Sequence, residues 1–431
     1  MEQFKKYEEL QQLLLSMKGE EDINNIKKFI DDNDLLKNNK RTLSTMKLIS
    51  SVIYARPKLL DNAVNLIKMF DKIELDNIRV QEYISDNDVI DRAIIIPIIL
   101  NLSGKKNSRM EKIFYNHSFF INPIKYWCQS YYINFGNNDY EDIKNMTDDE
   151  KIRFRNQMHS IHPIVQAILK DDVDKLQQLI SLNNFDINKK IPSSYFEHYS
   201  ILRNVPPLFY SASLGSVNCF KFLLNKTNDI DYEMLLKHAI VGGNNEIIHI
   251  IENESHSNLE YENVLLYNAI LYMNNELIEY LIHNYDIKID GEAYIKCIYS
   301  SNYEAMLKLI ELDDSNAINE HGDIGSSPLD IAAFEGYLDF LKFLLQNEKV
   351  DSHNLNSYGK TMLQSAARND QLDIVKYILK HKLLEPDDVG EYGISAVEIA
   401  ENYGNNDIVS YIESIGSEND DKHEDEREED Y

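Results

Sequence analysis

The sequence predicts an all-α fold in which an N-terminal helical region precedes a solenoid of helix–turn–helix repeats. Three observations support this prediction. Apolar residues recur at three- and four-residue spacing through residues 1–133. A self-similar pattern then occupies residues 158–416, with a period in the range that indicates a repeat architecture. Between them, residues 134–157 are polar and break the apolar rhythm, and residues 417–431 form an acidic tail.

The first 133 residues read as helices of ordinary length. In "FKKYEELQQLLLSM" one helical face carries Phe4, Tyr7, Leu10 or Gln11, and Leu14, and "INNIKKFI" repeats the pattern. Further helical runs are expected at residues 42–54, 58–70 and 89–102. The best linker is "NFGNNDYEDIKNMTDDE", which contains Gly and Asn and lacks apolar periodicity.

The repeats share one frame. "PLDIAAFEGYLDFLKFLL" (residues 328–345) aligns without a gap on "PLFYSASLGSVNCFKFLL" (residues 207–224). The frame starts eight times, at Pro163, Pro207, Leu235, Leu265, Ala293, Pro328, Met362 and Ala396.

Other positions of the frame test it independently. Counting the first residue as offset zero, offset four is always small, which lets two helices approach closely, and offset sixteen is always Leu or Ile. Offset eleven is acidic in every repeat but one, where Asn218 stands. An acid in the first turn of a helix meets the positive end of the helix dipole, which is worth about 0.3–1 kcal/mol. Each repeat is therefore expected to be a helix, a tight turn and a second helix, with a core that forms only when repeats stack.

These residues resemble ankyrin repeats, whose pattern is T-P-L-H-x-A-A-x-x-G followed by a second apolar helix. "SPLDIAAFEGYLDFLKFLL" and "GKTMLQSAARNDQLDIVKYIL" are the clearest copies. Over roughly residues 155–415, the chain is similar to the divergent ankyrin-repeat proteins of unknown function that are expanded in parasitic protists. The resemblance implies a stack of helix pairs used for protein binding.

The chain departs from the ankyrin pattern in three ways. The His of the T-P-L-H tetrapeptide is absent from all eight copies. The middle copies follow one another too closely for a full β-hairpin finger, and residues 188–205 form an insertion. Insertions in such arrays map to loops on one face, which is often the binding face.

Composition excludes several functions. The net charge is −28. Binding to nucleic-acid backbones or to anionic membranes requires Lys and Arg, so this charge argues against both functions. The longest apolar segment, "AIIIPIIL", is far shorter than the roughly 20 residues that span a bilayer. The N-terminus lacks the features of a secretory signal, so we expect an intracellular, cytoplasmic protein. The three cysteines fit reduced thiols.

Two short motifs admit a chemical interpretation. "AIVGGNNEIIHII" could hold a phosphate at Gly242 and Gly243, but the frame places a helix before the loop, where a phosphate loop needs a strand. His159 and His162 in "HSIHP" could share a metal, although Pro163 places the pair in a loop or at a helix cap. The tail could bind calcium or a basic partner, with solubility the simpler role. We therefore expect no catalytic site, no cofactor and no metal.

The expected function is non-enzymatic binding of another protein through the concave helices and inter-repeat loops. In ankyrin-like repeats, the residues just before the tight turn line the concave side. The candidate protein-binding residues are Leu271, Tyr272, Tyr299, Phe334, Glu335, Arg368, Asn369 and Tyr403. Packing between repeats is an alternative role for each aromatic.

Two other functions stay open. An enzyme or regulatory subunit could carry its activity in the N-terminal region and use the repeats as an adaptor. A self-associating scaffold is also possible, although we expect a monomer that binds no nucleic acid and inserts into no membrane.

Overall fold

The structure is a computed structural model, and it describes residues 2–70, 147, 150, 159–182, 185–192, 194, 197, 199–255 and 263–415. The expected helix at 89–102, the tail at 417–431 and all of the expected linker except residues 147 and 150 lie outside these residues. The described chain divides into two compact parts. We call Tyr7–Ile287 with Ser300–Ala305 the N-terminal part, and Met1–Lys6 with Lys288–Tyr299 and Met306–Tyr431 the C-terminal part.

The N-terminal helices form where the apolar spacing predicts them. They are α1 (Glu2–Ser16), α2 (Glu20–Asp32), α3 (Asn39–Ala55), the 3-10 turn η1 (Pro57–Leu59) and α4 (Leu60–Lys68). The predicted face of the first helix is buried throughout, including Gln11. Asn38 caps α3 by accepting a hydrogen bond from the backbone N–H of Arg41.

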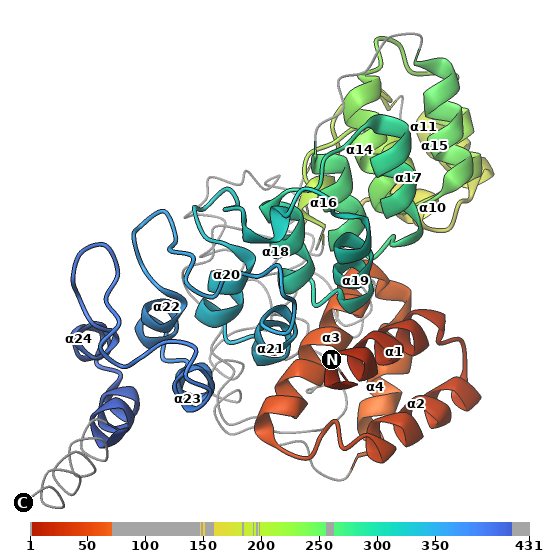
Figure 1. The fold of residues 1–431 in the computed structure, drawn as a ribbon. Coiled ribbons are helices and arrows are strands. Elements are labelled where there is room, and N and C mark those ends of the chain that lie inside the picture. The colour runs from red at the N-terminus through yellow and green to blue at the C-terminus, as the bar shows by residue number, and fades with distance from the viewer. Residues whose placement is uncertain are drawn as a thin grey trace, which may run out of the picture. The chain divides into compact units, whose positions relative to one another are not determined.

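Residues 163–415 hold eight helix pairs (Figure 1). The first helices of the pairs are α10 (Pro163–Leu169), α12 (Pro207–Ser213), α14 (Tyr232–Gly242), α16 (Val264–Leu271), α18 (Gly291–Tyr299), α20 (Pro328–Phe334), α22 (Met362–Arg368) and α24 (Ala396–Tyr403). The second helices are α11 (Val173–Leu182), α13 (Val217–Leu224), α15 (Asn245–Glu254), α17 (Glu276–Tyr285), α19 (Tyr303–Leu312), α21 (Leu338–Leu344), α23 (Leu372–Lys380) and residues 406–415. The all-α prediction is confirmed for the described residues, none of which lies in a strand.

Local chemistry explains where the first helices begin. Proline opens α10, α12 and α20, since its missing N–H is not needed in the first turn. Thr361 and Ser395 form capping boxes with Gln364 and Glu398. Gln364 and Glu398 stand where the ankyrin pattern has its His, so these side chains supply part of the missing hydrogen bonding.

The core of the repeats follows the frame. The small residue at offset four is buried in all eight pairs, and the Leu or Ile at offset sixteen is buried in all but the first. Small side chains allow neighbouring first helices to pack side by side, as α12 does with α14, and α20 with α22. Stacking of repeats therefore builds the core.

A polar residue at offset nine also ties neighbouring repeats together. Asn274 donates hydrogen bonds from Nδ2 to the carbonyls of Ile240 and Val241, at 2.7 and 3.0 Å. Asn302 and Asn405 bond the preceding first helix in the same way, and so does the hydroxyl of Ser216. These carbonyls lie at a helix end, where helical geometry provides no partner.

Three consecutive finger loops precede the first helices of the last three repeats. We define them as residues 317–326, 351–360 and 385–394. The loops project from the helices of these repeats (Figure 1). Ser357 donates its N–H to the carbonyl of Gly325, and Glu391 donates to that of Gly359, each at 2.7 Å. These bonds join each loop to the one before it.

Among the described helices, none combines the length and the apolar character that crossing a membrane requires.

Candidate functional site

The Gly-Gly loop of the third repeat is a tight corner. Gly243 ends α14 with φ +62°, a conformation that glycine adopts without strain. A Cβ on Gly242 would lie 2.2 Å from the carbonyl oxygen of Ala212, so the backbones of two repeats touch there. Asn244 then caps α15. The glycines serve the close approach of neighbouring repeats, and a helix precedes them, as the frame predicts.

The two histidines of "HSIHP" have separate partners. His159 lies 3.2 Å from Oε1 of the buried Glu197. His162 caps α10 by accepting the N–H of Ile164, and its ring packs on Phe185. Burial lowers the pKa of His162. Among the described residues, no group of three His, Cys, Asp or Glu side chains is placed to hold a metal.

Part of the insertion at 188–205 packs inward, including Glu197 and Tyr199, whereas residues 188–190 are exposed. Glu197 accepts hydrogen bonds from the N–H groups of Ser160 and Tyr199 and from the hydroxyl of Tyr210. The hydroxyl of Tyr199 donates to the carbonyl of Ala55 at the end of α3, at 3.1 Å. The described part of the insertion therefore fixes the N-terminal helices to the repeats, and its buried groups are closed to a partner.

The N-terminal helices cover the surface of the fourth repeat within the N-terminal part. Tyr272, at the end of α16, is 1% exposed and packs against the rings of Tyr54 and Tyr199. Arg56 donates to the carbonyl of Tyr272 at 3.0 Å and to Oδ1 of Asn274 at 2.6 Å. We call this set the N-terminal contact.

Helix α1 makes a similar contact at the turn of the fifth repeat. Gln11 donates from Nε2 to Oδ1 of Asn302 at 2.7 Å, and its Oε1 accepts the N–H of Glu304 at 3.2 Å. Tyr7 stacks on Tyr303 with 5.1 Å between ring centroids. The buried polar groups of this surface are thus paired by the chain itself.

The structure divides the eight candidate residues into two groups. Leu271, Tyr272 and Tyr299 are buried, the first two among the residues of the N-terminal part. Phe334, Glu335 and Asn369 are half-buried, whereas Arg368 and Tyr403 are exposed. The guanidinium of Arg368 lies 5.3 Å from the ring centroid of Tyr403. Only the second group can face a partner in this conformation.

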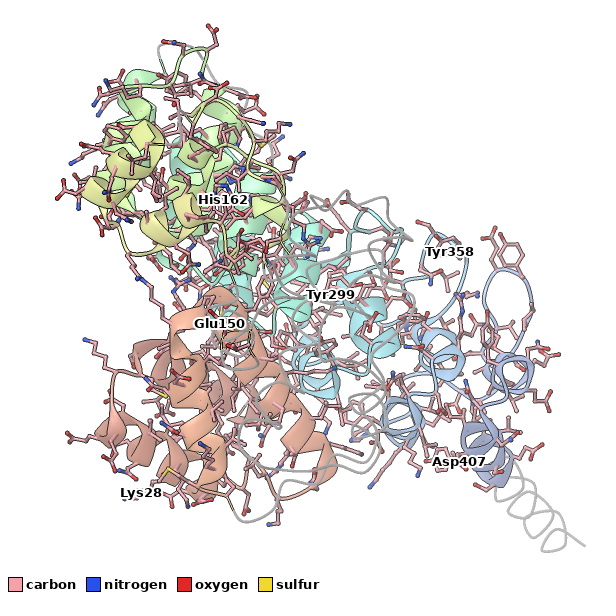
Figure 2. All side chains as sticks on the ribbon, turned by 180° about the vertical axis from the view of Figure 1, so that it is seen from behind. Lys28, Glu150, His162, Tyr299, Tyr358 and Asp407 are labelled. Atoms are coloured by element: carbon pink, nitrogen blue, oxygen red, sulfur yellow. The ribbon has the colours of Figure 1, made fainter. Side chains whose placement is uncertain are left out.

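Exposed apolar side chains gather in the finger loops. Ile324, Tyr358 and Tyr392 are 43%, 59% and 69% exposed. Each stands four residues before the start of a first helix and directly before a glycine of positive φ, so the three positions are equivalent. Figure 2 shows Tyr358 on a loop that projects beyond the helices. We call these three residues the finger row.

The sequence carried a signal for the finger row that the frame did not use. The three residues recur every 34 positions, four residues before the frame start. They lie in the loop before each helix pair, outside the offsets that define the frame. Large apolar residues that stay exposed in a polar loop are interface candidates.

Comparison with known proteins agrees with this geometry. Residues 329–423 match the family model described as ankyrin repeats in three copies. This segment therefore resembles ankyrin repeats in sequence as well as in its helix pairs. Residues 218–309 match a domain of unknown function, DUF3447, and this segment includes the residues of the fourth repeat and of the turn of the fifth that the N-terminal helices contact.

The name of one curated relative also refers to ankyrin repeats. The chain is 28% identical over 195 residues to a protein of Acanthamoeba polyphaga mimivirus that is named as an ankyrin repeat protein. The alignment covers 43% of this chain and 29% of the relative, so the chain spans less than a third of the protein it matches. The resemblance to proteins of parasitic protists stays a prediction.

Proposed function

We propose that this protein captures a protein partner, without catalysis, through the last three ankyrin repeats. The finger row carries the proposal, because three equivalent apolar side chains stand exposed in consecutive, hydrogen-bonded loops. Exposed large apolar side chains that cluster on a folded surface mark interaction sites. Tyrosine is also enriched among the residues that dominate protein–protein binding energy.

The exposed concave residues extend the same surface. Arg368 and Tyr403 end the first helices of the seventh and eighth repeats, and Phe334 and Glu335 hold the corresponding positions in the sixth. Asn369 donates to the carbonyl of Phe334 at 2.7 Å, which fixes two neighbouring positions relative to each other. A surface whose backbone is already ordered loses less entropy when a partner binds.

The fourth repeat has a different role in this proposal. Leu271 and Tyr272 are buried within the N-terminal part, and the N-terminal contact satisfies the polar groups around Tyr272. We therefore assign them to holding the N-terminal helices. No observation on the described residues favours the alternative of an activity in the N-terminal region.

We propose an intracellular, cytoplasmic monomer that binds neither nucleic acid nor a membrane. The net charge of −28 supports the last two expectations, because it opposes the approach of nucleic acids and anionic membranes.

Site-specific photo-crosslinking of the full chain tests the proposal. A photoreactive amino acid is placed at Tyr358, Tyr392 or Tyr403 in cells that express the protein. Leu182 and Met234, which are exposed outside the last three repeats, serve as matched control positions. We expect the three test positions to yield the same crosslinked protein and the controls to yield none. Crosslinks from the controls alone, or from no position, would contradict the proposal.

A further inference from the structure

We propose that the finger row takes a positively charged polypeptide segment in polyproline II conformation with an apolar side chain at every third residue. The inference rests on the proposed function and names the class of its partner. It follows from the spacing of the finger row and from the charge of the loops that carry it.

The spacing comes from the stacking of the repeats. Ile324, Tyr358 and Tyr392 occupy the same place in successive loops, and hydrogen bonds tie each loop to its neighbour. The first helices behind these loops pack side by side, α20 on α22 and α22 on α24. Packed helices lie about 8–10 Å apart. The finger row therefore presents apolar side chains at intervals of about that distance.

A polyproline II segment matches this interval. It rises about 3.1 Å per residue with three residues per turn, so every third side chain lies on one face at about 9.3 Å intervals. A β-strand rises similarly, but every third side chain of a strand lies on the opposite face. An α-helix would place neighbouring same-face residues about 5.4 Å apart along its axis. Among these regular conformations, only polyproline II places successive side chains of one face at the interval that separates neighbouring ankyrin-like repeats.

The negative charge of the finger loops favours a partner segment of positive charge. The three finger loops contain seven acidic residues and one lysine, Lys360. The acids are Glu320, Asp323, Asp351, Glu385, Asp387, Asp388 and Glu391. All except Asp388 are exposed, so their charges reach the solvent beside the finger row. Each exposed ion pair is worth about 0.2–1 kcal/mol, so several must act together to give about a tenfold preference.

Three synthetic peptides test the inference on the full chain. They are four tandem copies of Lys-Pro-Leu, of Glu-Pro-Leu and of Lys-Pro-Ser, and binding is measured by fluorescence anisotropy. We expect the Lys-Pro-Leu peptide to bind at least about tenfold more tightly than either of the other two. Raising the salt from about 50 mM to about 500 mM should weaken its binding several-fold, because the charges are exposed.

Two double variants locate the binding. Tyr358→Ser with Tyr392→Ser should weaken Lys-Pro-Leu binding at least about tenfold, and Glu385→Lys with Asp387→Lys should weaken it similarly. The matched control, Leu182→Ser with Asp174→Lys, changes an exposed apolar residue and an exposed acid on α11 and should leave binding unchanged. All variants keep the acidic tail, so binding that survives the tyrosine changes would show that the peptide sits elsewhere and would overturn the inference.

The outcomes separate this inference from the proposed function. If Glu-Pro-Leu binds as tightly as Lys-Pro-Leu, or if no peptide binds while crosslinks from Tyr358 and Tyr392 still capture a partner, the partner class is wrong and the binding surface stands. If those crosslinks also fail, the surface itself is wrong.

Discussion

At the scale of single residues, His238 gives the repeats a predictable response to acid. Its ring is 1% exposed, and burial lowers its pKa to about 3. Nδ1 lies 2.8 Å from the hydroxyl of Ser213 in the neighbouring repeat, and the Phe209 ring packs edge-on against it. The imidazole is therefore mostly neutral in the folded protein at pH values well above this pKa.

The sign of the effect follows from proton uptake. Between a pKa of about 3 in the folded chain and about 6.5 in the unfolded chain, the unfolded chain binds the additional proton. Stability contributed by His238 is thus fully present above the unfolded value and is lost as the pH falls, by up to about 1.4 kcal/mol per pH unit.

Between about pH 6.5 and 4, the unfolding free energy of His238→Gln should decrease less with falling pH than that of the wild type. Urea denaturation at several pH values measures this dependence. His353→Gln, which changes an exposed histidine, is the control and should keep the wild-type slope. A His238→Gln variant with the same acid sensitivity as the wild type would show that other groups set this response.

Asn274 tests the polar contacts between repeats. Its amide bonds two carbonyls of the preceding helix and accepts from Arg56, and it is fully buried. Asn405 has the same frame position and bonds two carbonyls, but it is half-exposed. Unpaired buried groups cost about 1–3 kcal/mol each. We expect Asn274→Ala to lower the unfolding free energy by about 2–4 kcal/mol and Asn405→Ala by about 1 kcal/mol or less. Equal losses of unfolding free energy in the two variants would show that burial does not set the strength of these contacts.

The asparagines at offset nine also show the limit of sequence reasoning about residues. The residue type is visible in the sequence, and Asn is a common helix cap. The acceptors, however, lie 32–38 positions away for Asn274, Asn302 and Asn405, so the bonds exist only once neighbouring repeats stack.

At the scale of elements, two of the three positive-φ glycines in the finger loops form a matched pair for measurement. Gly359 has φ +65°, and an added Cβ would lie 2.5 Å from Cβ of Glu391 in the next loop. Gly393 has φ +68°, and an added Cβ would meet nothing within 4 Å. Replacement by Ala strains both backbones by about 1 kcal/mol. Only Gly359→Ala should add a clash between loops, which we expect to cost a further 1–3 kcal/mol or so in thermal or urea unfolding. A loss no larger than that of Gly393→Ala would show that the loops do not stack.

Helix positions were largely predictable because the repeat frame carries them. Five first helices start at the predicted residue, namely Pro163, Pro207, Pro328, Met362 and Ala396. Helix α14 starts earlier than Leu235, at Tyr232, because Asp231 caps it by accepting the N–H of Met234. The frame was set on apolar residues and could not register a cap outside its own pattern.

At the scale of the whole molecule, the sequence could not show that the chain covers part of its own array. The apolar faces of α1 and α3 predict burial, but a sequence does not say against what. Arg56 reaches residues more than 200 positions away, and Gln11 reaches Asn302, 291 positions away. The sequence therefore predicts interface residues at the concave positions of the fourth repeat, and the burial of these residues appears only in their long-range contacts.

In our proposal, the finger row of the last three repeats is the surface that captures a partner. The direct measurement compares partner capture by two folded triple variants. The first carries Ile324→Ser, Tyr358→Ser and Tyr392→Ser, and the control carries Leu182→Ser, Met69→Ser and Met234→Ser at exposed positions elsewhere. Because every changed side chain is exposed, both variants should keep wild-type melting temperatures within a few degrees or so. We expect the first variant to lose the partner while the control keeps it. Capture retained by the first variant would show that the finger row is not the binding surface.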